Sequence, residues 1–187
     1  MSVASVHGPG LAAAFNFPRI QCIWQPFLGI VTLYGGDAAE ARHRLDESRQ
    51  LCLQRKERVR LTKIYTYLAE VDLWEGAIDQ AGYWLAQSLT DGIQSARVTF
   101  DEVQQCWVAA RLATAQHQYQ RSATLFGLAE QAHSHIQHCI NGPLRALADE
   151  ALAIVQATLE PAVFAKAFAA GQQMTLEDAF ATILTEC

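Results

Sequence analysis

The densest group of potential metal ligands in this chain is a histidine-cysteine cluster, His133, His135, His138 and Cys139. In a helix, His135 lies one turn from His138 and from Cys139, a spacing at which imidazole and thiolate groups can share one metal ion. No partner ligands stand out elsewhere, and histidine is also favoured at a helix C-terminus, where it complements the helix dipole. We therefore favour the dipole interpretation over a metal site and expect no cofactor.

Residues for acid–base or nucleophilic catalysis are dispersed along the chain. The acidic side chains, among them Glu40, Glu47, Glu70 and Asp72, fall where solvent-facing helix surfaces are expected. No nucleophile stands in a recognisable turn, and the chain lacks the G-x-x-x-x-G-K-[ST] loop that cradles phosphate groups. The sequence therefore predicts a protein that is not an enzyme.

The elements that would position any site follow a repeat. Gly36, Gly76 and His117 are predicted turns, 40 and 41 residues apart. Each turn is preceded by a small residue and followed by small or apolar residues at the same three spacings. The preceding residues are Gly29, Ala69 and Ala110; the following sets are Ala41, Ala81 and Ser122, then Leu45, Leu85 and Phe126, then Ser48, Ser88 and Ala129. Small sites flanked by large apolar residues at a fixed period predict a stack of helical hairpins.

The predicted organisation has three parts. Residues 1–20 form an irregular tail, residues 21–140 form three helical hairpins, and residues 141–187 form capping helices. The cap begins at Asn141-Gly142-Pro143, where glycine ends one helix and proline opens the next. In the cap, Thr175 and Asp178 resemble a capping box before the last helix. The fold class is all-α.

Composition limits the surroundings and the partners of the chain. Its net charge is −5, and we interpret its Lys and Arg residues as spread along the sequence, which argues against a nucleic-acid interface. The five cysteines form no C-x-x-C pair, which is typical of a reducing cytoplasm. No apolar run reaches the length of a membrane span, and no secretion signal is recognisable. We expect a cytoplasmic protein.

The repeat landmarks resemble those of the tetratricopeptide repeat. In that family the first helix carries a Leu-Gly pair and the second carries Ala, a bulky residue and Ala, spaced by four and three. Leu28-Gly29, Gly36-Asp37 and Ala81-Leu85-Ser88 match this pattern, whereas the period is longer than the usual 34 or so residues and His117 replaces a turn glycine. The resemblance implies a right-handed α-α superhelix.

Two segments resemble the ends of larger bacterial regulators. Tyr119-Gln-Arg-Ser-Ala-Thr-Leu-Phe-Gly-Leu-Ala-Glu130 is similar to an A-A-x-L-x-G-A-A-E stretch near their C-terminus. Phe164-Ala-Lys-Ala-Phe-Ala-Ala-Gly171, followed by Met174-Thr-Leu-Glu-Asp-Ala179, resembles their terminal A-F-x-x-A-W-x-x-G-x-x-M-x-x-E-E-A pattern. These proteins are signalling ATPases of the STAND and LuxR/AfsR-like type, and the resemblance covers only their helical sensor arm.

A stack of hairpins presents its first helices on the concave face. Large aromatic side chains there supply rigid contact area, and arginine can pair with carboxylates. The predicted partner-binding residues are Tyr34, Lys63, Tyr67, Glu70, Trp74, Trp107 and Arg111. Glu70 and Arg111 occupy equivalent places in successive repeats, which predicts an ion pair between them. Trp74 and Trp107 have an alternative role as packing residues between hairpins.

The sequence therefore predicts a non-catalytic module that binds a peptide or a partner domain, as in the arm of a transcriptional or signalling regulator. The alternative is a receptor for a small-molecule inducer, with an enclosed cavity lined by Tyr67, Trp74 and Trp107. The first helix also carries apolar residues that no preceding repeat covers, among them Trp24, Phe27 and Leu28. We expect two chains to pair through this face as a homodimer; the alternative is that residues 1–20 fold back over it.

Overall fold

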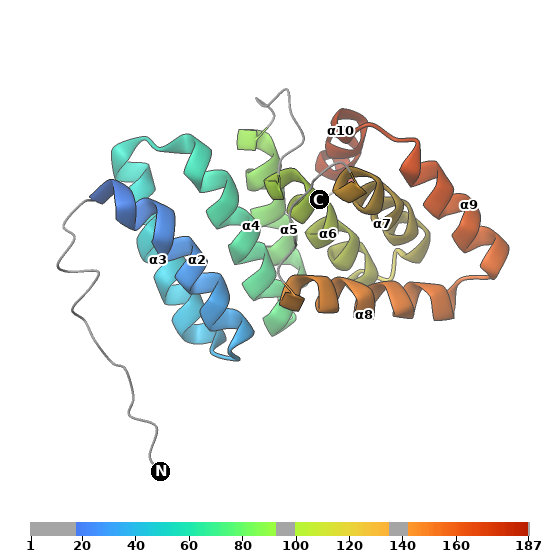
Figure 1. The fold of residues 1–187 in the computed structure, drawn as a ribbon, viewed down its shortest axis with the longest axis horizontal. Helices are drawn as coiled ribbons and strands as arrows, with labels where there is room; N and C mark the ends of the chain where they lie inside the picture. The colour runs from blue at the N-terminus through green and yellow to red at the C-terminus, as the bar shows by residue number, and fades with distance from the viewer. Residues whose placement is uncertain (1–17, 93–99, 135–141, 187) are drawn as a thin grey trace, which may run out of the picture.

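The computed structural model describes residues 18–92, 100–134 and 142–186, and within these ranges it is helical throughout, without a strand (Figure 1). The nine helices in these ranges are α2 (Pro18–Tyr34), α3 (Ala38–Arg55), α4 (Arg58–Glu75), α5 (Ile78–Gly92), α6 (Phe100–Ala115), α7 (Tyr119–Ser134), α8 (Gly142–Thr158), α9 (Pro161–Gln172) and α10 (Leu176–Glu186). The predicted all-α class is confirmed. Helix α2 begins three residues earlier than predicted, at a proline, which is favoured at the first position of a helix.

The three predicted turns share one backbone conformation. Gly36, Gly76 and His117 have φ angles of 93°, 76° and 60°, in the left-handed region. At each turn the next amide donates to the carbonyl oxygen five residues before it, at 2.8–3.2 Å. This is the Schellman arrangement that satisfies the last carbonyls of a helix. The prediction that His117 takes the place of a turn glycine is therefore confirmed.

Successive helices pack as neighbouring hairpins. Helices α2 and α3, α4 and α5, and α6 and α7 each form a tightly packed pair, and α3 packs on α4. The first helices of the pairs also touch one another, α2 with α4 and α4 with α6. We call the side on which α2, α4 and α6 meet the first-helix face. Figure 1 shows helices α2 to α7 lying side by side along the molecule.

Small residues allow the close approach within hairpins. Gly29, Ala69 and Ala110 are all buried, as the repeat predicted. A Cβ atom added at Gly29 would lie 2.9 Å from Cγ of Leu45 on α3, closer than real contacts permit. Two buried clusters follow from this packing, one centred on α2 to α4 and one extending from α4 to α10, and Tyr34 and Trp84 contact both. The core is therefore continuous along the array.

The last three helices depart from the hairpin pattern. Helix α8 packs on α6 and α7, and α9 packs closely on α7, while α10 contacts α5 and α7. Gly127 on α7 and Gly171 on α9 have no room for a side chain, because a Cβ atom would overlap the carbonyl oxygens of Phe168 and Thr124 respectively. The two glycines therefore let the backbones of α7 and α9 touch. The predicted cap of α10 is formed by Thr175, whose hydroxyl accepts from the amide of Asp178 at 3.1 Å.

Two predictions concern residues only partly described. Of the metal-binding cluster, only His133 lies in the described ranges, near the end of α7, and His135, His138 and Cys139 lie outside them. Among the residues that are described, no three His, Cys, Asp or Glu side chains are grouped to hold a metal ion. Within the same residues, no helix has both the length and the apolarity needed to cross a membrane.

Candidate functional site: the first-helix face and its basic corner

Helix α4 supplies the centre of the first-helix face. Lys63, Tyr67 and Glu70 follow one another at helical spacing along it, as predicted. The carboxylate of Glu70 is fully buried and accepts a hydrogen bond from the guanidinium of Arg111 on α6. The predicted ion pair between successive hairpins is therefore present. It lies inside the structure, where it joins α4 to α6. Asp72 on α4 is buried as well, so the expectation of a solvent-facing carboxylate is wrong for Glu70 and for Asp72.

Tyr34 completes this buried polar group from α2. Burial and the nearby negative charge of Glu70 raise the pKa of Tyr34 well above its ordinary value, although Arg111 opposes the shift. Burial also raises the pKa of Tyr67. Both phenols therefore stay neutral across the physiological pH range. The two phenols therefore supply no titrating acid or base there.

Three of the predicted partner-binding residues are withdrawn from the surface. Tyr67, Glu70 and Trp107 have no exposed area. Tyr67 packs edge-on against Phe27 at 6.3 Å between ring centroids, and Trp107 lies 5.5 Å from the ring of His133. Helical spacing correctly predicted the side of the helix on which these residues lie, but neighbouring helices cover them. Because they cannot touch a partner in this conformation, we remove them from the candidate contact surface.

Trp74 lies at the surface, unlike Tyr67, Glu70 and Trp107. It stands near the end of α4, and 44% of its area is exposed. Its indole is therefore accessible, which favours a surface role over the packing role that was its alternative. It lies about three helical turns from Lys63, so the two residues do not share a compact site.

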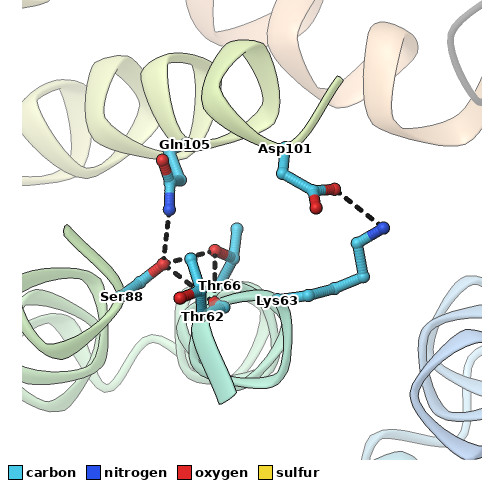
Figure 2. Close-up of polar contacts among 6 residues, drawn as sticks. All are labelled: Thr62, Lys63, Thr66, Ser88, Asp101 and Gln105. Atoms are coloured by element: carbon cyan, nitrogen blue, oxygen red, sulfur yellow. Dashed lines mark hydrogen bonds and ion pairs between the residues drawn. The ribbon is translucent and has the colours of Figure 1, made fainter. Parts of the chain in front are cut away.

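A cavity opens where the three first helices meet. It holds about 190 Å³ and is lined by Cys22, Ile23, Pro26, Phe27, Arg60, Lys63 and Asp101. The ammonium of Lys63 bonds to Asp101 at 2.7 Å (Figure 2). It also lies 4.7 Å from the centre of the Phe27 ring. We call this cavity the Phe27 pocket. It combines an aromatic wall with two cations, and it contains one predicted site residue, Lys63.

A buried hydrogen-bond network beside Lys63 joins two of the helices that form the pocket. Figure 2 shows Ser88 of α5 at the centre of this network. Its hydroxyl donates to the carbonyl of Thr62, bonds to the hydroxyl of Thr66, and accepts from the side-chain amide of Gln105, at 2.7–2.9 Å. Since Thr62 and Thr66 belong to α4 and Gln105 to α6, one serine joins three helices. The network therefore holds α4 against α6, while its bonds do not include α2, which supplies Phe27.

A group of cations that the sequence analysis missed lies beside the pocket. Five of the 14 Lys and Arg residues fall between positions 55 and 63: Arg55, Lys56, Arg58, Arg60 and Lys63. We call this group the basic corner. Arg55, Lys56 and Arg58 are exposed, and Arg60 and Lys63 line the pocket. The expectation that Lys and Arg are spread along the chain is therefore wrong at this turn. Counting Lys and Arg residues in a short sequence window, and not over the whole chain, identifies the group.

The outer side of α2 carries an exposed apolar stripe. Trp24, Leu28 and Val31 are 61%, 46% and 64% exposed and follow one another at helical spacing. From residue 20 to residue 34 the sequence contains no Asp, Glu, Lys or Arg. Phe27, in contrast, turns toward α4 and reaches Lys63 and Tyr67. The predicted uncovered face of the first helix is therefore present at these three residues.

Two of the buried thiols, Cys52 and Cys106, are poor nucleophiles. Cys22 and Cys52 are buried and free of disulfides. Burial, together with a hydrogen bond to Cys22, raises the pKa of Cys52 to about 12. Burial likewise raises the pKa of Cys106. Because a thiolate is the reactive form, Cys52 and Cys106 stay neutral and unreactive near pH 7.

A second cavity lies at the turn between α6 and α7. It holds about 620 Å³ and is lined by His117, Gln118, Tyr119, Gln120, Arg121 and Leu159. His117 and Tyr119 bond to each other across it, ring nitrogen to hydroxyl, at 2.8 Å. This cavity contains none of the predicted site residues. It lies at the foot of the third hairpin, away from the first-helix face.

The first-helix face thus offers a small pocket with an aromatic ring, two cations and the carboxylate of Asp101, and two residues of this pocket belong to the basic corner. Such a surface is equipped to hold a ligand by apolar contact and charge. The chain matches no family model, no curated protein and no solved structure in the three comparisons made with it.

Proposed function

We propose that this chain is an interaction module of helical hairpins that binds a segment of another protein on its first-helix face. The Phe27 pocket carries this proposal, because it opens where three successive first helices converge. Phe27, Ile23 and Pro26 can bury an apolar side chain, while Arg60 and Lys63 can orient a polar one. Hot spots of protein interfaces combine these same chemistries.

The size of the pocket favours a protein partner over a small molecule. Sites for small ligands typically enclose about 300–1,000 Å³. The Phe27 pocket holds about 190 Å³, which suits one anchoring side chain of a larger partner. The alternative function, a receptor for a small molecule, requires a cavity lined by Tyr67, Trp74 and Trp107. Tyr67 and Trp107 are packed in the core, and neither cavity described above contains any of the three.

We further propose that the module serves as the sensor arm of a STAND or LuxR/AfsR-like regulator in the cytoplasm. The two segments that resemble those proteins lie on α7 and α9, and each contributes one glycine, Gly127 or Gly171, to the contact between these helices. The buried free thiols Cys22, Cys52 and Cys106 support a reducing compartment. The coding sequence upstream of Met1 tests the assignment: an in-frame nucleotide-binding domain supports it, and an unrelated gene contradicts it.

A peptide-display selection tests the binding function. The wild-type chain is presented to a library of random linear peptides, and the enriched pool is then tested on a Phe27→Ala variant. The control is Tyr83→Ala, which removes an aromatic ring exposed on α5, outside the pocket. We expect peptides that bind the wild type and the control but lose affinity for Phe27→Ala. Peptides that bind all three equally would place the site elsewhere.

A further inference from the structure

We infer that the partner segment is acidic and carries one large apolar side chain, which enters the Phe27 pocket while its carboxylates lie on the basic corner. This inference rests on the proposed function and names the chemistry of the ligand for the same site. It commits to an acidic peptide; anionic lipid, nucleic acid and a neutral peptide are outcomes that the test below separates.

The basic corner has cations to spare. Arg60 bonds to Glu57, and Lys63 bonds to Asp101. For Arg55, Lys56 and Arg58 the described part of the chain shows no ion pair, and all three are exposed. An acidic segment would supply the missing carboxylates. Charge complementarity of this kind mainly sets the association rate and the choice of partner.

Stability of the fold explains only part of this group of cations, because Arg55 and Lys56 lie at the C-terminal end of α3, where positive charge complements the helix dipole. Lys56 has a φ angle of 58°, in a left-handed position that favours glycine. Arg58 opens α4, which has no acidic residue in its first turn and no side-chain cap. Positive charge at a helix N-terminus opposes the helix dipole, where acidic residues are preferred. The charge of Arg58 therefore weakens the local structure, as does the left-handed backbone of Lys56, and the placement of Arg58 points to a role in recognition.

The pocket and the basic corner share two residues. Arg60 and Lys63 belong to both the basic corner and the pocket, so a carboxylate and an apolar anchor one or two residues apart can reach both together. The ammonium of Lys63 lies over the ring of Phe27, so a positive charge is in contact with the apolar wall of the pocket. A ligand with only charge would leave this wall unused.

A short acidic segment fits the charge of the molecule better than a polyanion does. The chain carries a net charge of −5, so a long nucleic acid or an anionic membrane meets repulsion from the rest of the surface. At physiological ionic strength charges act over only about 8 Å. The carboxylates of a short peptide therefore interact with the cations of the basic corner and only weakly with charges elsewhere on the surface.

The test uses the peptides selected on the wild-type chain. We expect the enriched pool to be rich in Asp and Glu around one large apolar residue. The best peptide should bind a Lys56→Gln/Arg58→Gln variant about tenfold more weakly, because two exposed charge contacts are lost. The matched control, Arg44→Gln/Lys166→Gln, removes the same charge at a distance and should bind as the wild type does. Thermal unfolding of the first variant checks that it remains folded, as the positions of both residues predict.

The outcomes separate the inference from the proposed function. A pool that needs Phe27 but is not acidic, or that binds the Lys56→Gln/Arg58→Gln variant with wild-type affinity, overturns the inference and leaves the binding function standing. A selection that enriches nothing overturns both. Phosphatidylserine vesicles and single-stranded DNA are tested in parallel. If either binds through Lys56 and Arg58 and displaces no acidic peptide, the ligand is the lipid or the nucleic acid, and the inference fails.

Discussion

Left-handed backbone positions show most clearly what single residues contribute to this fold. Gly36 and Gly76 end their helices without strain, because glycine adopts positive φ freely. Lys56 and His117 adopt the same conformation with a side chain, which costs about 1–2 kcal/mol. The repeat spacing identified His117 as a turn residue despite its type. Lys56 lies between repeats, and the spacing gave no indication of its conformation.

His117→Gly should raise the free energy of unfolding. The strain removed exceeds the extra flexibility of glycine in the unfolded chain, and we expect a gain of about 0.5–1 kcal/mol in chemical denaturation. The converse change, Gly76→Ala, meets no atom within 4 Å and so tests backbone strain alone. It should cost about 1–2 kcal/mol. A His117→Gly variant that is less stable would show that the bond to Tyr119 outweighs the strain.

A buried carboxylate on α4 makes stability depend on pH. Asp72 is 2% exposed, and Arg42 of α3 bonds to it and to Glu75, each at 2.5 Å. Burial raises the pKa of Asp72 above its ordinary value, and the Arg42 guanidinium partly opposes this shift. Because the folded pKa is raised, the ionised carboxylate is a cost to folding that is relieved as pH falls. Arg42 limits this cost at neutral pH.

Arg42→Gln should therefore destabilise the protein most near pH 7. We expect a loss of about 1–3 kcal/mol there, since a buried charge keeps no cationic partner. The difference from wild type should shrink as pH falls through the raised pKa of Asp72, where the carboxyl becomes neutral. Urea denaturation of both proteins at several pH values measures it. The control, Arg44→Gln, breaks only the exposed pair with Glu40 and should change stability by less than about 1 kcal/mol. An Arg42→Gln deficit that is independent of pH would contradict the account.

At the scale of helices, the contact between α7 and α9 was not predictable from the repeat. The hairpins α2–α3 and α4–α5 follow from equivalent positions one period apart, so the spacing predicted their packing residues. Gly127 and Gly171 belong to no such pair, because α9 lies outside the repeat. Their sequence context suggested only a resemblance to other proteins. The sequence shows that a helix contains a glycine, but it does not show which carbonyl group of another helix packs against that glycine.

Gly171→Ala should separate α9 from α7. The added methyl group would overlap the carbonyl of Thr124, and backbone cannot rotate away as a side chain does. We expect a loss of about 1–3 kcal/mol, measured by chemical denaturation. The control is Gly82→Ala, where the nearest atom to the new Cβ lies 3.8 Å away and helix propensity improves. That variant should be as stable as wild type or more so. Equal effects of the two changes would mean that α9 packs otherwise.

At the scale of the whole molecule, the burial of side chains and the distribution of charge were harder to predict than the side of a helix on which each residue lies. The spacing correctly placed Lys63, Tyr67 and Glu70 on one side of α4. It could not show that Tyr67 and Glu70 are covered while Lys63 reaches a pocket, because covering depends on residues from α2 and α6. The net charge of −5 likewise did not reveal the basic corner, because a sum over the whole chain does not show where the charges lie.

The uncharged outer side of α2 leads to a prediction about association. We propose that two chains pair through Trp24, Leu28 and Val31, because apolar area is buried without bringing like charges together. Sedimentation should show a dimer in the wild type and a monomer in Trp24→Glu/Val31→Glu. The matched control is Tyr83→Glu/Val163→Glu, which places charges on exposed apolar sites of α5 and α9 and should leave the dimer intact. A wild type that stays monomeric at high concentration contradicts pairing.

Hydrogen exchange with a selected peptide bound tests the central claim most directly, because it locates the ligand without a mutation. The claim is that the first-helix face at the Phe27 pocket is the binding surface. Binding there should slow amide exchange in residues 22–31 and 55–66, and should leave α8, α9 and α10 unchanged. Slowed exchange confined to α8, α9 and α10, or around the cavity at His117, would contradict the claim.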